Sequence, residues 1–363
     1  MESNINVSSP RPICSLGAGI ETLSMDILQQ IANRSHPKDL TQLSMASKFF
    51  LPLRIELFAT RKTLIIKDGI YQNEVSSFQL SMASKFFSLI RNKLFTTRKT
   101  LLIRDGSDLD PLSNFIKDNI QSVSVIQQYF NLSCLTMFKN LKVLRIVNGE
   151  IVHVSPLASL VKIQELYLMS NLIFDVYPLA SLVNLKILQL SNNMIADISP
   201  LASLIKLQLL DLEENYITDA SPLAALVGLE ELQLGGNAIV DTSALISLVN
   251  LKQLHLRGNI IEDISPLVTL AKLEKLQLGS NRIVDISSLA ELVKLKQLYL
   301  HSNRIVDISP LAGLFELKEL GLDGNQILDI SPLTSLTKLE KLHIGSNQIV
   351  DTSPLAALVN LTL

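Results

Sequence analysis

The hydrophobic pattern of the chain is dominated by a period of 22 residues, which runs ten times from residue 141 to residue 360 without an insertion or deletion. Seven positions are apolar in nearly every copy: 1, 4, 6, 11, 14, 17 and 20. Burying seven apolar side chains stabilises by roughly 10–20 kcal/mol per copy, whereas fixing the backbone costs ~1–2 kcal/mol per residue. A lone copy should therefore not fold, and the copies must stack on one another.

The two halves of each copy predict different elements. The first half alternates apolar and other residues, as in Leu188-Gln189-Leu190, which predicts one short strand per copy and hence a parallel sheet. The second half reads Asp-Ile-Ser-Pro-Leu, as in residues 263–267. Ser or Asp can cap a helical turn and Pro is tolerated at its start, so this half predicts a short 3-10 turn on the outer side.

An asparagine follows the last strand leucine of nine copies by three residues. Its amide both donates and accepts hydrogen bonds, so it can satisfy backbone groups left bare where the strand turns away, in its own copy and the next. We predict a structural role for this column, which consists of Asn171, Asn193, Asn215, Asn237, Asn259, Asn281, Asn303, Asn325 and Asn347.

The consensus LxxLxLxxNxIxDISPLAxL resembles the 22-residue leucine-rich repeat of the internalin type and covers 220 of the 363 residues. The predicted fold class is an α/β repeat solenoid. It is a leucine-rich repeat arc with a parallel concave sheet and short 3-10 turns on the convex side, preceded by a small α-helical N-terminal module. Because the consensus consists of core and turn residues, the resemblance specifies the fold, and function should depend on the variable positions.

The segment near the start of the chain predicts short amphipathic helices. Ile27 and Ile31 fall on one helical face, and Pro37 begins a second helix. The segment resembles an F-box through Leu23, Leu28, Ile31, Pro37, Asp39, Leu40, Leu43, Ser47, Lys48 and Phe50. It departs from the F-box pattern where Ser24 replaces the early Pro.

The resemblance implies that this segment docks on a Skp-type subunit of a cullin ubiquitin ligase. The implied contact residues are Leu23, Ile27, Leu28, Ile31, Pro37, Leu40 and Leu43. The alternative is that the helices only cap the N-terminal end of the solenoid.

A second repeat precedes the array. Residues 42–50 recur at 79–87, and residues 61–66 recur at 98–103, both with an offset of 37. We interpret this as a tandem duplication of a helix-plus-strand unit, with irregular strands near residues 64, 101 and 123 ahead of the regular array. The expected organisation is a flexible leader at 1–20, the F-box-like module at 21–60, the duplicated units and irregular repeats at 61–140, ten repeats at 141–360, and a truncated eleventh at 361–363.

Partner binding is expected at the variable positions on the concave face, because the residues between the strand leucines face solvent. Aromatic, His and Arg side chains there are typical of interface hot spots. The candidate residues are Tyr167, Asp211, Glu213, His255, Arg257, Tyr299, His301 and His343. The alternative is an ordinary solvated surface, and the acidic group of Asp211, Glu213 and Glu214 is expected to be one.

No chemistry beyond binding is indicated. His255, His301 and His343 are two repeats apart, or ~10 Å by strand spacing, which is too far for one shared metal ion. Motifs for phosphate binding, nucleophilic catalysis or kinase activity are missing, so we expect no enzyme, no catalytic residue and no cofactor. Dense basic stripes are also missing, which argues against nucleic acid as a partner.

The net charge is −2, and no apolar run approaches the ~18 residues that a membrane span requires. The first 25 residues lack a signal-peptide pattern, because polar and proline residues interrupt them. Cys14 and Cys134 are too few for a disulfide framework, and Cys134 reads as a buried structural thiol. We therefore expect an intracellular protein without membrane contact, and the adhesive function of secreted internalins is not carried over.

The leading interpretation is a protein-interaction adaptor, in which the F-box-like segment docks on the ligase while the concave face binds a protein substrate. The alternative is a leucine-rich repeat scaffold or inhibitor with no ubiquitin link, whose helices act only as a cap. The combination also resembles proteins that intracellular parasites or large viruses direct at host ubiquitination, which makes a host-directed effector a possible role.

Overall fold

A computed structural model describes residues 130–361 together with the shorter stretches 53–57, 63–68, 100–103, 118 and 120–125. The chain divides into two compact units, residues 1–124 and residues 125–363. The F-box-like helices predicted between residues 21 and 50 lie outside the described residues.

The first unit contains strands β1 (Leu53–Leu57), β2 (Thr63–Asp68) and β3 (Thr100–Ile103). Strand β1 pairs antiparallel with β2, and β2 pairs parallel with β3. The β2–β3 register places Leu64 opposite Leu101, which is its equivalent in the 37-residue duplication. The duplicated strands therefore lie side by side. A further strand, β4 (Ser122–Val125), lies where the two units meet in the sequence.

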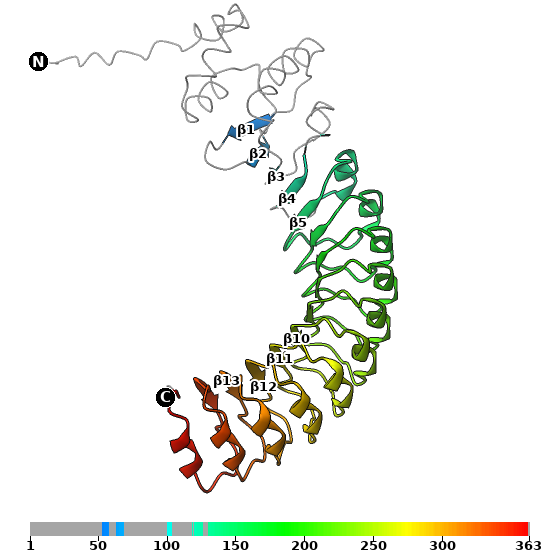
Figure 1. Ribbon diagram of the computed structural model, residues 1–363. Helices are drawn as coiled ribbons and strands as arrows, with labels where there is room; N and C mark the ends of the chain where they lie inside the picture. Colours follow the sequence, from blue (N-terminus) through cyan, green and yellow to red (C-terminus); the bar gives the residue numbers. More distant parts are fainter. Residues whose placement is uncertain are drawn as a thin grey trace, which may run out of the picture. The chain divides into compact units, whose positions relative to one another are not determined.

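The second unit is a solenoid whose copies each contribute one short parallel strand (Figure 1). These strands are β5 (Val143–Ile146), β6 (Glu165–Tyr167), β7 (Ile187–Gln189), β8 (Leu209–Asp211), β9 (Glu231–Gln233), β10 (Gln253–His255), β11 (Lys275–Gln277), β12 (Gln297–Tyr299), β13 (Glu319–Gly321) and β14 (Lys341–His343). Each residue pairs with its equivalent one copy away, as Leu254 does with Leu232 and Leu276. The sheet therefore keeps the register of the repeat.

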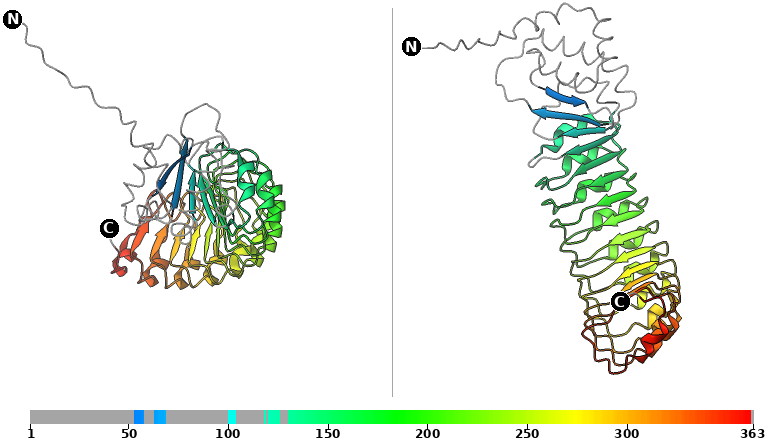
Figure 2. Two further views of the ribbon diagram at one scale, coloured as in Figure 1. Left: turned by 90° about the horizontal axis from the view of Figure 1, so that it is seen from above. Right: turned by 90° about the vertical axis from the view of Figure 1, so that its left-hand side faces the viewer.

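Short 3-10 turns follow the strands on the opposite side of the coil. They are η2 (Leu132–Met137), η3 (Ser155–Ser159), η4 (Tyr177–Ser181), η5 (Ser199–Ser203), η6 (Ser221–Ala225), η7 (Ser243–Ser247), η8 (Ser265–Thr269), η9 (Ser287–Glu291), η10 (Ser309–Gly313), η11 (Ser331–Ser335) and η12 (Ser353–Ala357). Within this unit the strands line the concave side and the turns line the convex side (Figures 1 and 2). The predicted fold class of the array is confirmed.

The core lies between the sheet and the turns and consists of the seven apolar positions of the repeat. In one interior copy these side chains are no more than 1% exposed: Leu251, Leu254, Leu256, Ile261, Ile264, Leu267 and Leu270. In the last copy the equivalent Leu342 and Ile344 are only partly buried, because no further described copy covers them. Burial in this fold is therefore supplied by the neighbouring copies.

The asparagine column forms buried ladders between copies. Asn259 Nδ2 donates to the carbonyl oxygens of Leu256, in its own copy, and Leu234, in the preceding copy, at 3.0 Å each. Its Oδ1 accepts the N–H of Ile239, also in the preceding copy, at 3.0 Å. The structural role is confirmed, but the neighbour that each asparagine serves is the preceding copy and not the next one.

The residue before each asparagine position adopts a left-handed backbone in all ten copies. These residues are Asn148, Ser170, Asn192, Glu214, Gly236, Gly258, Ser280, Ser302, Gly324 and Ser346, with φ between 51° and 70°. Side chains disfavour this conformation because Cβ approaches the following carbonyl oxygen. Each copy therefore places a tight bend directly after its strand.

Replacing Gly258 with alanine should lower the free energy of unfolding by about 1–2 kcal/mol, the cost of a left-handed backbone with a Cβ. The added methyl group itself has room, since its nearest neighbour would be 3.5 Å away. Gly313→Ala is the matched control, because no atom lies within 4 Å of its added Cβ. Urea denaturation should find the control neutral or stabilised, and equal destabilisation of both variants would contradict the backbone explanation.

From η4 onward, an aspartate two residues before each 3-10 turn accepts the N–H of the first residue of the turn. Asp307 Oδ1 accepts the N–H of Ser309 at 2.7 Å, and Oδ2 accepts its hydroxyl at 2.9 Å. Pro310 then occupies the second residue of the turn. The hydrogen bond from the Ser309 N–H, and to a smaller extent the bond from its hydroxyl, lowers the pKa of the Asp307 carboxyl below its ordinary 3.8. The same capping lowers the pKa of Asp197, Asp241, Asp263 and Asp351.

Because the pKa is depressed in the folded state, the stability from this charge is present above pH 3.8 and is lost as the pH falls through the lower folded value. Asp307→Asn keeps an acceptor for the N–H but carries no titrating charge. Urea denaturation across a pH series should therefore show wild type more stable than the variant at neutral pH, with the difference shrinking in acid. A difference that stays constant with pH would refute this explanation.

Candidate protein-binding face

The sequence-predicted site residues lie at two positions of the repeat on the concave side. Tyr167, Asp211, His255, Tyr299 and His343 are the last residues of β6, β8, β10, β12 and β14. Glu213, Arg257 and His301 follow two residues later in their copies. The strand leucines on either side are buried in the core, so the side chains between them are directed to the other face of the sheet.

Tyr299 is held by a chain of polar contacts across neighbouring strands. Its hydroxyl donates to Glu319 Oε2 at 2.5 Å, and Lys341 Nζ donates to Glu319 Oε1 at 2.9 Å. Burial, and to a smaller extent the hydrogen bond to Glu319, raises the pKa of Tyr299 to about 12. The hydrogen bond from Tyr299 lowers the pKa of Glu319. The tyrosine is thus a neutral donor fixed in one orientation.

His301 leans over the backbone of Gly279, which belongs to the preceding copy. A Cβ added to Gly279 would overlap the imidazole ring, so this glycine provides the space that His301 occupies. Burial and then the positive charge of Arg257 lower the pKa of His301, and Asp323 opposes this effect. The structure therefore brings His301 within electrostatic reach of Arg257, although a whole copy separates them in the sequence.

The acidic group differs from the sequence-based expectation. Asp211 is only 6% exposed, and its carboxylate accepts the hydroxyl of Ser191 at 2.8 Å and the N–H of Glu213 at 3.1 Å. Burial raises the pKa of its carboxyl. The expectation of an exposed, solvated patch was wrong for Asp211, while Glu214 is exposed and Glu213 is half-buried.

His255 joins this acidic group. Its Nδ1 lies 3.5 Å from Glu213 Oε1, although Glu213 is two copies earlier. Gly235 stands between them, and a Cβ there would lie only 3.2 Å from Glu213 Oε1, so the missing side chain leaves room for the contact. The Nε2 atom of His255 is buried and makes no hydrogen bond.

Tyr167 forms a separate group toward the start of the array. The guanidinium carbon of Arg145 lies 4.1 Å from the centre of its ring, in a cation–π arrangement. Its hydroxyl donates to Glu165 Oε2 at 3.0 Å. Burial, then the hydrogen bond to Glu165, raises its pKa. His343 is exposed on β14, the strand that also carries Lys341 of the Tyr299 group.

Sequence reasoning missed the residues that orient the candidates, namely Arg145, Glu165, Gly235, Gly279 and Glu319. Some of them could have been found by comparing residues at one repeat position, because these residues lie next to one another in neighbouring copies. A glycine at the same repeat position as a His or Glu of a neighbouring copy leaves room for that side chain. Among the described residues, no three His, Cys, Asp or Glu side chains lie close enough to hold a metal ion.

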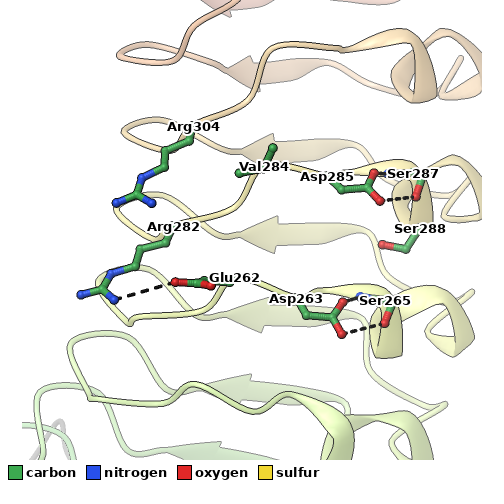
Figure 3. A pocket seen from close by; sticks show the side chains of 9 residues that line it. All are labelled: Glu262, Asp263, Ser265, Arg282, Val284, Asp285, Ser287, Ser288 and Arg304. Atoms are coloured by element: carbon green, nitrogen blue, oxygen red, sulfur yellow. Dashed lines mark hydrogen bonds and ion pairs between the residues drawn. The ribbon is translucent and has the colours of Figure 1, made fainter.

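A cavity of about 350 Å³ lies away from the concave face, on the loops that follow β10 to β12 (Figure 3). Arg282 and Arg304 lie on neighbouring loops at one end, and Val284 lies between them and the capping aspartates. Ser288 stands where most copies have proline, and its hydroxyl donates to the Ile264 carbonyl at 3.1 Å.

Across the part of the chain with described coordinates, no helix is long and apolar enough to span a membrane.

A family model described as leucine rich repeats (2 copies) matches residues 183–225, 227–269, 271–313 and 316–357. The solved structure of internalin C2 from Listeria monocytogenes is 41% identical, with 51% of this chain and 81% of that chain covered at a TM-score of 0.50. The chain therefore belongs to the leucine-rich repeat proteins.

The array is similar to further bacterial repeat proteins. An internalin, inlF, from Listeria monocytogenes is 28% identical, with 77% of this chain and 93% of that chain covered at a TM-score of 0.69. The leucine-rich repeat protein LIC12759 from Leptospira interrogans is 26% identical, with 74% and 73% covered at a TM-score of 0.66. No curated protein matches the chain.

Proposed function

We propose that this leucine-rich repeat scaffold is an adaptor that holds a protein partner on its concave face. The observation that carries the proposal is the fixed arrangement of polar and aromatic side chains there. Tyr299 is tied to Glu319, His301 lies on Gly279, and Arg145 covers Tyr167. Side chains already fixed in place lose less entropy on binding, and aromatic and Arg residues are the usual hot spots of interfaces.

The proposal is tested with the full chain and a variant carrying Arg257→Ala, Tyr299→Ala and His301→Ala. The matched control carries three alanines at exposed positions near the convex turn η9, namely Glu291, Val293 and Lys294. Quantitative affinity purification from the native cell should lose specific partners with the concave variant and keep them with the control. Equal partner recovery by both variants, each with an unchanged melting temperature, would overturn the proposal.

The F-box-like segment favours a finer role, in which the chain docks on a Skp-type subunit of a cullin ubiquitin ligase inside the cell. The residues that support it are the matches between Leu23 and Phe50. The ligase would supply the chemistry, and the adaptor would raise the effective concentration of the bound substrate near it. The chain itself performs no catalytic step in this scheme.

Binding of a purified Skp-type protein to the full chain tests the ligase link. We expect binding to wild type and its loss in Leu28→Asp/Leu40→Asp, while partners of the array are retained. A wild-type chain that does not bind the Skp-type protein would eliminate the link. The remaining function would then be the scaffold or inhibitor, with the helices acting as an N-terminal cap.

A further inference from the structure

Exposed aromatic and apolar side chains gather on one flank of the array, where the chain leaves the strands of the second to fourth copies. We call this surface the aromatic flank and define it by Leu172, Phe174, Tyr177, Met194 and Tyr216. The exposed fractions of Phe174, Tyr177 and Tyr216 are 52%, 74% and 63%. Three of the six aromatic residues between positions 141 and 361 therefore lie together in solvent, which is unusual for a surface without a binding role.

Backbone hydrogen bonds place these side chains on consecutive rungs. The N–H groups of Leu172, Met194 and Tyr216 each donate to the preceding copy, to the carbonyls of Ile151, Ile173 and Ile195, at 2.8–2.9 Å. Equivalent residues of adjacent copies are thus ~4.8 Å apart. Phe174 extends the surface toward the first copy, where its ring meets His153 edge to face at 6.1 Å. Leu172, Met194 and Tyr216 therefore form one row along the array.

Negative charge prevails in the copies that carry the aromatic flank. From strand to turn, the second to fifth copies contain nine Asp and Glu residues and no Lys or Arg, in residues 165–177, 187–199, 209–221 and 231–243. The pKa of the capping carboxylates Asp197 and Asp241 is lowered by hydrogen bonds from Ser199 and Ser243, whereas burial raises the pKa of Asp211. The Lys residues of these copies lie outside the stretches named.

The same stretch of the last five copies is different. It contains five basic residues, namely Arg257, Lys275, Arg282, Arg304 and Lys341. Arg282 and Arg304 occupy the repeat position that Leu172, Met194 and Tyr216 occupy on the aromatic flank, and Figure 3 shows them on neighbouring loops. These later stretches also contain eight Asp and Glu residues, so the early copies are distinguished by their aromatic side chains and by their lack of Lys and Arg in this stretch.

We propose that the aromatic flank binds a basic amphipathic segment of a protein partner, in which apolar side chains are accompanied by Lys or Arg. The apolar side chains of the segment cover the exposed rings, and its cations pair with the surrounding carboxylates. Arg145 over Tyr167 is an example within this chain of a cation placed on an aromatic ring. Phosphate-bearing surfaces, such as nucleic acid or anionic lipid, are repelled by the exposed carboxylates of these stretches, which are Asp175, Asp197, Glu214, Asp219 and Asp241.

This site goes beyond the proposed function, because it lies outside the concave group of Arg257, Tyr299 and His301. The probes are a synthetic amphipathic Leu–Lys helix and its Leu–Glu counterpart, both labelled for fluorescence anisotropy with the full chain. We expect the Leu–Lys helix to bind with an affinity that falls as salt is added, and the Leu–Glu helix not to bind.

Phe174→Ser/Tyr216→Ser should weaken binding of the Leu–Lys helix by about tenfold or more, as for aromatic anchors in other interfaces. The matched control is Val284→Ser/Val306→Ser, two exposed apolar residues of later copies, which should leave the affinity unchanged. The Arg257→Ala/Tyr299→Ala/His301→Ala variant should bind the Leu–Lys helix as wild type does. This result separates the test of the aromatic flank from that of the concave face. Equal binding of both helices, or an unchanged affinity in Phe174→Ser/Tyr216→Ser, would overturn the proposal.

Discussion

Replacing Asn259 with alanine is expected to lower the free energy of unfolding by roughly 2–6 kcal/mol, because a buried N–H left without a partner costs about 1–3 kcal/mol and each of two further hydrogen bonds contributes about 0.5–1.5 kcal/mol. The N–H of Ile239 loses its partner. The carbonyls of Leu234 and Leu256 each lose one of two amide donors and keep the other, from Asn237 and Asn281 respectively. Asn259 itself is only 6% exposed, so water cannot readily replace the amide. Urea denaturation followed by circular dichroism measures the loss.

Asn250→Ala is the matched control, since Asn250 is half-buried and also links copies, but through hydrogen bonds that are exposed to solvent. Its Nδ2 donates to the Val227 carbonyl at 2.9 Å, and its Oδ1 accepts from Lys272 Nζ at 2.7 Å. Water can replace both bonds, so the expected change stays within about 0.5 kcal/mol. Similar losses in the two variants would mean that burial of the amide ladder is not what stabilises the array.

Leu276→Ala is expected to destabilise the array by about 2–5 kcal/mol, the cost of a cavity in a packed core. Leu276 lies at the centre of β11 and is fully buried. Because each copy contacts only its neighbours, a weakened copy in the middle should also separate the unfolding of the two halves. Denaturant melts should therefore become broader or show two transitions.

The matched control for this variant is Leu342→Ala, which changes the same repeat position in β14. Leu342 is partly exposed, so truncation removes less buried surface and should cost clearly less than Leu276→Ala. An equal loss at both positions would contradict the view that neighbouring copies supply the burial.

The regular part of the fold could be predicted because its causes are local and recur in every copy. Alternation of leucines predicts the strands, and the Asp-x-Ser-Pro pattern predicts the capped 3-10 turns, as seen at Asp307 and Ser309. Strand β1 was missed although Leu53, Ile55 and Leu57 alternate with polar residues, because this stretch was assigned to the helical module.

Contacts between copies could not be predicted in the same way. The 22-residue pattern does not distinguish the preceding copy from the following one, so it does not reveal that Asn259 bonds to the preceding copy. Asp211 shares its repeat position with Gln189 and Gln233, and its burial depends on bonds from Ser191 and the Glu213 backbone. The position of His301 depends on a missing side chain at Gly279. Such contacts require the geometry of adjacent copies.

Photo-crosslinking in cells that express the full chain tests most directly whether the concave face is the protein-binding surface. A photo-crosslinking amino acid replaces Gln277, on β11 between the strands of His255 and Tyr299, or replaces the exposed Glu291 at the end of η9 on the convex side. The predicted result is discrete protein adducts from position 277 that position 291 does not give and that disappear in the Arg257→Ala/Tyr299→Ala/His301→Ala background. Adducts formed equally from both positions, or from position 291 alone, would contradict it.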